Sequence, residues 1–457
     1  MKKNLNLTSD PIFVLLKKIA IPSMTGSLFQ TLFNLVDTFY AGKISYEALA
    51  ALAKAFPLYF IIISAGIGIV AGCNSLIANS LGENNKVGAS IYSYNSFVYG
   101  TLLSILITFI GIFFGDNLLG LMGSSDDSIA LSTKYTDIIF LGTIFFLILT
   151  CFNSILYAQG DTKTYRNVLI VGVILNIILN PIFIFGLFFI PSFGIAGLAI
   201  STVLIQFFAC IYLYFKVSKT QLRIIPKLSN FSIRRNFFYN IVNQCMPITA
   251  ALFLVAVGSY LLLFFINIFG DKATAGYGAA VRFEHLFSLP VIGLNTAVIS
   301  IAGQNFGAKR YNRIKEVYFK SITIGFIIMC IAGLIIYLSS EDIIRIFSQD
   351  YEVIKFGSSY LKIAAFIGPV LPVFFISHGL FTALKKTYLI FYSNLFRMVF
   401  LPFIIVWFIL NIMDGYYNDI FYGLLIMNWS FGIIMLFISR AIMIKTFNEE
   451  KKVFFIF

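Results

Sequence analysis

Residues 165–188 read YRNVLIVGVILNIILNPIFIFGLF, and Arg166 is the only charged residue among them. A helix of about 20 mainly apolar residues is long enough to cross the hydrocarbon core of a bilayer. The stretch therefore predicts a transmembrane helix. Asn176 and Asn180 interrupt its apolar character at a spacing of about one helical turn, which sets both amides on the same face of that helix.

Further apolar runs of comparable length lie on both sides of this stretch. Hydrophobic residues make up 59% of the chain and charged residues only 12%, which is far from the composition of a soluble domain. Besides closed β-barrels, only α-helices satisfy all of their backbone hydrogen bonds inside a bilayer, and the apolar runs have the length of helical spans. The sequence therefore predicts an all-α integral membrane protein with twelve transmembrane helices. The twelve predicted spans are 14–41, 47–80, 90–115, 134–158, 165–188, 194–216, 237–268, 275–306, 317–338, 357–382, 388–411 and 418–445.

The net charge of +13 could suggest a nucleic-acid partner, but the basic residues lie between the apolar runs rather than on one soluble face. When the twelve spans alternate in direction, 24 Lys and Arg residues fall on the side of the two termini and 6 on the opposite side. Because Lys and Arg accumulate in cytoplasmic loops, both termini are predicted to be cytoplasmic. No nucleic-acid partner is expected.

An internal repeat relates the two halves of the sequence. A shift of 225 residues pairs Pro22 with Pro247, and the same register holds without a gap over about 140 residues, mostly at helix breakers and helix ends. The sequence therefore predicts two parallel six-helix bundles related by a pseudo-twofold axis along the membrane normal. The predicted parts are an N-lobe at 1–216, a cytoplasmic linker at 217–236 and a C-lobe at 237–457.

Asp37 is a carboxylate inside an apolar run, where a charge is costly and usually functional. Gln30, Asn34 and Asp37 follow one another at helical spacing, so they form a polar stripe on one face of the predicted helix. The 225-residue shift places Leu262 at the position of Asp37, so the second half has no carboxylate there. This asymmetry argues against a purely structural role.

Other polar side chains are expected at the depth of Asp37, in the outer half of the membrane. Asn176, Asn180 and Thr202 carry oxygen atoms at that depth, and with Asp37 and Asn34 they form a candidate proton or sodium site. A low-dielectric cavity favours the neutral form of a carboxyl group. Binding of a proton or a sodium ion would therefore remove the penalty for enclosing Asp37. The alternative is a structural Asp37 that caps its helix near the membrane surface.

The second half carries different charges within its spans. Glu284 is a candidate to bind a cationic substrate or a proton, and His378 is a candidate proton carrier near neutral pH. Arg282 either belongs to the same set or neutralises Glu284. Lys54 and Arg397 also lie within predicted spans, and both are expected to snorkel towards the interface or to pair locally.

Motifs of nucleotide hydrolysis, zinc proteolysis and serine hydrolysis are absent from the sequence: GxxxxGK[ST], HExxH and GxSxG do not occur. The five cysteines fall inside apolar runs without a CxxC spacing, so neither a disulfide framework nor a metal cluster is expected. We expect no cofactor besides a coupling proton or sodium ion, and no metal site apart from sodium at Asp37.

Taken together, several segments resemble the multidrug and toxic compound extrusion (MATE) transporters over nearly the whole chain. The resemblance implies two six-helix bundles around a V-shaped cavity, and exchange of protons or sodium ions for drugs and other organic, often cationic, compounds. The segments that carry it are Phe33–Gly42 (FNLVDTFYAG), Tyr157–Thr162 (YAQGDT), Asn176–Gly186 (NIILNPIFIFG), Gly194–Thr202 (GIAGLAIST) and Gly276–Lys309, which includes AVRFEHLFSLPVIGL and GQNFGAK.

The resemblance also implies roles for single residues. The essential acidic residue of DinF-like members falls on Asp37, their amide pair on Asn176 and Asn180, and their hydroxyl on Thr202. Archaeal relatives often have Asp where this chain has Asn180, which leaves one carboxylate in the site and the identity of its ion open. NorM-like members carry acidic residues in the seventh and tenth spans that have no counterpart here, which favours the DinF-like branch, with Glu284 as the acidic residue of the second half.

The residues suggest one leading function and two alternatives. The leading hypothesis is a cation-coupled antiporter that exports drugs or other organic compounds, works as a monomer among membrane lipids and resides in the plasma membrane, the inner membrane of a bacterium. A lipid-linked oligosaccharide flippase is expected to line its cavity with several arginines, whereas only Arg282 and Arg397 lie within spans here. An intramembrane acyltransferase would need a motif around His285 or His378, and none is present.

Overall fold

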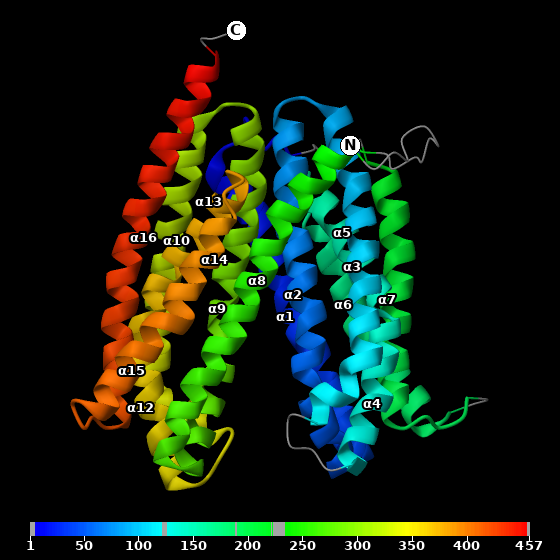
Figure 1. Ribbon diagram of the computed structural model, residues 1–457, viewed down its shortest axis with the longest axis vertical. Helices are drawn as coiled ribbons and strands as arrows, with labels where there is room; N and C mark the ends of the chain where they lie inside the picture. The colour runs from blue at the N-terminus through cyan, green and yellow to red at the C-terminus, as the bar shows by residue number, and fades with distance from the viewer. Residues whose placement is uncertain (1–4, 121–125, 188–189, 221, 223–233, 455–457) are drawn as a thin grey trace. The chain divides into compact units, whose positions relative to one another are not determined.

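The computed structural model describes residues 5–120, 126–187, 190–220, 222 and 234–454, and every regular element in them is helical (Figure 1). The helices of the first half are α1 (Ile12–Ile44), α2 (Tyr46–Gly82), α3 (Lys86–Gly120), α4 (Asp126–Leu141), α5 (Thr143–Ala158), α6 (Lys163–Phe185) and α7 (Ile195–Ser218). Those of the second half are α8 (Arg235–Ile266), η2 (Asn267–Phe269), α9 (Asp271–Gly307), α10 (Tyr311–Leu338), α11 (Ser340–Arg345), α12 (Tyr351–Ile367), η3 (Gly368–Val370), α13 (Leu371–Ala383), α14 (Tyr388–Asn394), η4 (Leu395–Phe400), α15 (Leu401–Asn411) and α16 (Tyr417–Phe454).

These helices confirm the predicted twelve spans. Within the described residues, eleven helices are long and apolar enough to cross a membrane, and the bent pair α4 and α5 makes a twelfth. The pair corresponds to the predicted span 134–158, which the structure bends by 45° at Gly142. A Cβ atom at residue 142 would lie 2.4 Å from Val203 Cγ2, so only glycine fits against α7 at this bend.

By the contacts among its residues, the chain divides into two compact units. One comprises Thr25–Thr249, and the other comprises Met1–Met24 together with Ala250–Phe457. The first turns of α1 therefore belong with the second half of the sequence, and the first turns of α8 with the first half. Most of the predicted linker 217–236, namely residues 221 and 223–233, lies outside the described residues.

Each unit has one central helix that packs against three others. In the unit Thr25–Thr249 the central helix is α2, which contacts α3, α4 and α5; in the other unit it is α9, which contacts α10, α12 and α13. A shift of 225 residues carries each of these helices onto its counterpart. The internal repeat predicted from the sequence therefore holds for the packing between helices as well as for the positions of helix breakers and helix ends.

The outer faces of the units are apolar, as lipid contact requires. On α3, for example, Leu102, Ile105 and Phe109 each expose more than half of their surface along one face of the helix. An exposed apolar face of this kind is costly in water and favourable against lipid chains.

Candidate functional site

Asp37 lies in the unit Thr25–Thr249, where α1, α6 and α7 meet. Its side chain is 6% exposed. Asn176 Nδ2 donates a hydrogen bond to Asp37 Oδ1 at 2.8 Å, and Asn180 Nδ2 donates to the same oxygen at 3.0 Å. Thr202 Oγ1 donates to Asp37 Oδ2 at 3.4 Å. The structure thus brings together four of the five residues that the sequence assigned to a cation site.

Local features of the three helices produce this arrangement. The spacing of Asn176 and Asn180 puts both amides on the face of α6 that contacts α1, and the Tyr40 hydroxyl of α1 donates to the Ile177 carbonyl at 3.1 Å on the same side. Helix α7 approaches the end of α6 closely because residue 197 is glycine. A Cβ atom there would lie 2.4 Å from the Phe183 carbonyl oxygen.

Two details of the site could not be read from the sequence. The single proton of the Ser201 hydroxyl is shared between Asn180 Oδ1 and the Leu198 carbonyl oxygen, which lies 2.9 Å from Oγ, so Ser201 holds the second amide in place. The only sequence signal for Ser201 was its position next to Thr202. Asn34, by contrast, is half-buried and makes no hydrogen bond to Asp37 in the described part of the chain; its backbone carbonyl accepts from Thr38 Oγ1 at 2.8 Å.

The electrostatics of the Asp37 site are unusual for a buried carboxylate. Its three hydrogen-bond donors are neutral, and no Lys, Arg or His forms an ion pair with it within the described ranges. Asn176 is fully buried, and its Oδ1 atom has no hydrogen-bond partner among the described residues. The site therefore offers a carboxylate and a free amide oxygen without a fixed cation.

The three residues predicted for the second half do not form one cluster. Glu284 Oε2 accepts a hydrogen bond from the Tyr360 hydroxyl at 2.6 Å. His378 Nε2 lies 3.1 Å from Ser393 Oγ, while Arg282 is exposed. Among the described residues, no hydrogen bond or ion pair joins any two of Arg282, Glu284 and His378, so Arg282 does not neutralise Glu284 by contact.

Arg397 does not snorkel towards the membrane surface. It is 7% exposed, its Nε donates to Asn428 Oδ1 at 2.9 Å, and its guanidinium carbon lies 3.8 Å from the centroid of the Phe374 ring. The predicted local pairing is thus with a neutral amide and a ring. Sequence reasoning gave no functional role to this residue.

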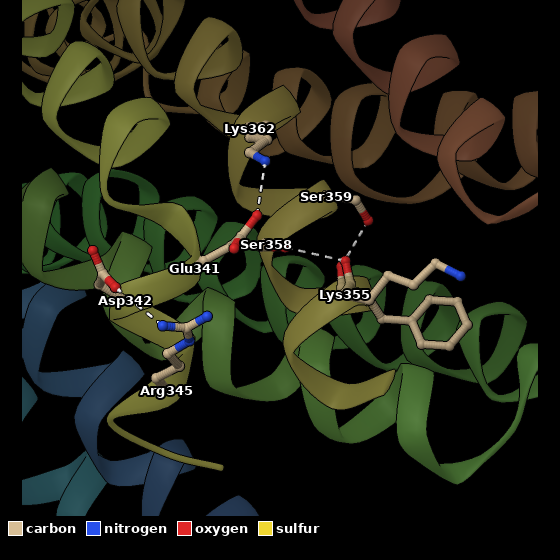
Figure 2. A network of polar contacts seen from close by, with 8 residues as sticks. Glu341, Asp342, Arg345, Lys355, Ser358, Ser359 and Lys362 are labelled. Atoms are coloured by element: carbon tan, nitrogen blue, oxygen red, sulfur yellow. Dashed lines mark hydrogen bonds and ion pairs between the residues drawn. The ribbon is translucent and has the colours of Figure 1, made fainter. Parts of the chain in front are cut away.

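A second polar network lies at one end of the unit formed by Met1–Met24 and Ala250–Phe457 (Figure 2). Lys362 Nζ pairs with Glu341 Oε1 at 3.4 Å, and Arg345 Nη1 lies 3.9 Å from Asp342 Oδ1. All of these side chains are at least 43% exposed, so their pairing contributes little to stability. The network holds basic residues that the charge count assigned to the side opposite the termini.

The equivalent end of the unit Thr25–Thr249 has a different charge pattern. The 225-residue shift places Asp137 at the position of Lys362 and Asp116 at that of Glu341. The two aspartates line a cavity of about 360 Å³ together with Lys134 and Thr133. In the described ranges, no group of three or more His, Cys, Asp and Glu side chains is arranged to hold a metal ion.

Comparison with known proteins identifies relatives over most of the chain. The family model MatE matches twice, at residues 22–182 and 247–408, and the two matches begin 225 residues apart. The relatives include the "probable multidrug resistance protein YoeA" of Bacillus subtilis, which is 28% identical over 75% of each chain. The "probable multidrug resistance protein NorM" of Thermotoga maritima is 26% identical over 76% of this chain and 74% of its own. An "FAD transporter" of Shewanella oneidensis is 24% identical over 79% of this chain and 80% of its own.

Solved structures share the fold. A multidrug resistance MATE family transporter of the MOP superfamily, in an outward-facing conformation, superposes with a TM-score of 0.90 over 97% of this chain and 99% of its own, at 23% identity. A MOP superfamily transporter from Pyrococcus furiosus superposes with a TM-score of 0.89 at 22% identity. The double match of the family model and these structures confirm the predicted fold class and the repeat.

Proposed function

Because this chain belongs to the MatE family, whose members are multi-pass secondary transporters and not enzymes, we propose that it exports organic compounds in exchange for a cation that binds at Asp37. Family membership rules out the acyltransferase hypothesis. The multidrug resistance proteins among the relatives favour drugs as substrates, and the FAD transporter indicates that anionic compounds also belong to the range of the family.

One observation carries the proposed coupling site. Asp37 is buried, and the described residues supply it with three neutral donors and no fixed positive charge. A buried carboxylate without a counter-charge is costly, by several kcal/mol on general grounds. A mobile cation that enters and leaves the site would offset this cost only while it is bound, as a coupling ion must.

The geometry also suits the exchange step. A proton on Asp37 would neutralise the carboxylate and give it an O–H donor, for which the free Asn176 Oδ1 is an acceptor in the same site. A sodium ion would instead be held by oxygen atoms, and Asp37, the free Asn176 Oδ1 and the Thr202 hydroxyl are oxygens of the required kind. In both cases, neutralisation lowers the cost of enclosing the site, so the cation and the exported compound alternate.

Several further features belong to the same proposal. We expect a monomer of the DinF-like branch in the plasma membrane, the inner membrane of a bacterium, with both termini cytoplasmic and lipids around its apolar faces. The N-lobe 1–216 and the C-lobe 237–457 remain the two proposed halves of the transporter, joined by the linker 217–236. The alternative function is that of a flippase, whose substrate is a lipid-linked oligosaccharide.

The test compares Asp37→Asn with Asp116→Asn, which removes an exposed carboxylate from the same half of the chain. Efflux of a fluorescent cation is measured from proteoliposomes under an imposed sodium gradient at constant pH, and under a pH gradient without sodium. Asp37→Asn should abolish gradient-driven efflux under both conditions, and Asp116→Asn should retain it. Sodium- or proton-driven efflux by Asp37→Asn at the wild-type rate would refute the proposal, and the wild-type response to the two gradients identifies the ion.

A further inference from the structure

Arg397 lies near the middle of a predicted span that is not a regular α-helix. Residues 395–400 form the π-helical turn η4 between α14 and α15, and the Leu401 N–H donates to the Phe396 carbonyl, five residues earlier. Pro402, which has no N–H, follows directly. Single π-helical turns inside α-helices occur frequently at functional sites. The corresponding helix of the other unit, α6, is continuous, and the 225-residue shift places Gly172 at the position of Arg397.

The guanidinium group of Arg397 has far more donors than partners. A guanidinium carries five N–H donors. In the described part of the chain, Nε donates to Asn428 Oδ1, the Phe374 ring centroid lies 3.8 Å from the guanidinium carbon, and neither Nη atom donates a hydrogen bond. Asn428 is neutral, so it cannot serve as a counter-charge. Its own Nδ2 donates a hydrogen bond to the Leu424 carbonyl at 2.8 Å.

The other polar groups of this region are engaged elsewhere. Glu284 is close enough for its charge to act on Arg397, but it does not form an ion pair with Arg397 in the described chain, and its carboxylate accepts from Tyr360. His378 bonds to Ser393, and Asn394 Nδ2 donates to the Ala251 carbonyl at 3.0 Å. A buried positive charge whose Nη donors make no hydrogen bond to the described residues is therefore left beside Asn428 and Phe374.

A buried charge without a contacting partner costs several kcal/mol. The cost falls when an anion accepts the free donors, and the fork of an arginine fits the two oxygens of a carboxylate or phosphate group. We propose that Arg397 binds an anionic group, carboxylate or phosphate, of the compound that this protein exports. The inference rests on the proposed export function and adds a substrate class to it. The two units then hold buried charges of opposite sign: Asp37 for the coupling cation and Arg397 for the substrate anion.

Two dyes of nearly the same shape test this assignment. Rhodamine 110 carries a free carboxylate, and rhodamine 123 is its methyl ester, which keeps the cationic ring system and lacks the anion. Fluorescence anisotropy gives the Kd of each dye for the purified full chain in phosphatidylcholine nanodiscs without an ion gradient. We expect the wild type to bind rhodamine 110 more tightly, and Arg397→Gln to weaken rhodamine 110 roughly tenfold to a hundredfold while changing rhodamine 123 by less than about threefold.

Arg397→Lys supplies a matched control, because it keeps the charge and loses the fork, so an intermediate Kd for rhodamine 110 is expected. A measurement on the wild type alone covers the case in which the variants do not fold. Benzoate should displace rhodamine 110, whereas equal concentrations of the neutral benzamide should not. Equal loss of both dyes in Arg397→Gln, or equal displacement by benzoate and benzamide, would overturn the inference.

These binding data are separate from the test of coupling. Equilibrium binding needs no cation gradient, so a failure of the Arg397 assignment leaves the Asp37→Asn result standing. Conversely, sodium- or proton-driven efflux by Asp37→Asn at the wild-type rate would refute coupling without changing the dye preference.

Discussion

A substitution of Asn176 tests whether Asp37 belongs to a coupling site or is a structural carboxylate. Replacing Asn176 by leucine removes two groups at once. The Nδ2 donor to Asp37 at 2.8 Å is lost, and so is the buried Oδ1 atom that has no partner in the described part of the chain. Asn180 is the natural comparison, because it makes the same donation at 3.0 Å while its Oδ1 already accepts from Ser201.

The expected sizes follow from these contacts. A hydrogen bond to a carboxylate contributes about 1.5–3 kcal/mol, and an unpartnered buried oxygen costs about 1–3 kcal/mol. In Asn176→Leu the two terms offset one another, so the free energy of unfolding should change by no more than about 2 kcal/mol. The loss of a ligand to the coupling ion is not offset. If the ion is sodium, this loss should raise the sodium concentration for half-maximal transport roughly tenfold to a hundredfold. If the ion is a proton, no such rise is expected, because the lost Nδ2 donor had favoured the charged carboxylate over the protonated one.

The assay is cation-driven efflux from proteoliposomes, measured over a series of sodium concentrations at fixed pH and over a pH series without sodium. Asn176→Leu should retain its melting temperature to within a few degrees and, where sodium drives efflux, require far more sodium. Asn180→Leu should shift the ion requirement less, because it removes no free oxygen. In a protein that sodium drives, an unchanged sodium requirement in Asn176→Leu, or a larger increase in Asn180→Leu, would refute the reasoning.

Two further changes test the fold. Gly142 has ordinary right-handed dihedral angles (φ −79°, ψ −7°), so the cost of Gly142→Ala should come only from the clash with Val203, about 1–3 kcal/mol of stability. The melting temperature should fall and recover in the double variant with Val203→Ala; a wild-type melting temperature in the single variant would contradict this. Asp350 accepts from Lys272 at 3.0 Å and from the N–H groups of Glu352 and Val353 at the start of α12, and these contacts, Lys272 first, lower the pKa of its carboxyl group. The stabilising effect of Asp350 should therefore be complete above the usual carboxyl pKa range and lost as the pH falls through the lowered pKa. Asp350→Asn should melt below the wild type at pH 7 and at the same temperature as the wild type in strong acid. A difference in melting temperature that persists in acid would count against the ion pair.

Hydropathy and backbone punctuation predicted most of the architecture. The twelve spans appear as apolar runs, and the pairing of Pro22 with Pro247 marks the internal repeat. The central helices α2 and α9 show the same repeat in their packing, since each contacts the corresponding three helices of its unit. The bend at Gly142 was hidden because the sequence is apolar on both sides of it. Nor does any local signal reveal that the first turns of α1 belong with the second half, since that depends on contacts distant in sequence.

The candidate sites were predicted less completely. Asp37, Asn176, Asn180 and Thr202 stood out because polar residues are rare in apolar runs and could be matched in depth. Asn34 shares a helix face with Asp37 in a helical projection, yet it is not bonded to it, because the spacing of residues along α1 does not fix which neighbour an amide faces. The roles of Tyr360 and Phe374 beside Glu284 and Arg397 depend on packing between helices, which composition does not encode.

The central claim is that Asp37 exchanges a cation for the exported compound. The most direct measurement is cation flux driven by the substrate: proteoliposomes are loaded with a transported dye at equal sodium concentration and pH on both sides, and the counter-movement of ²²Na⁺ or protons is recorded as the dye leaves. The wild type should move one of these cations against the dye, and Asp37→Asn should move neither. Dye-driven cation flux in Asp37→Asn at the wild-type rate would contradict the account.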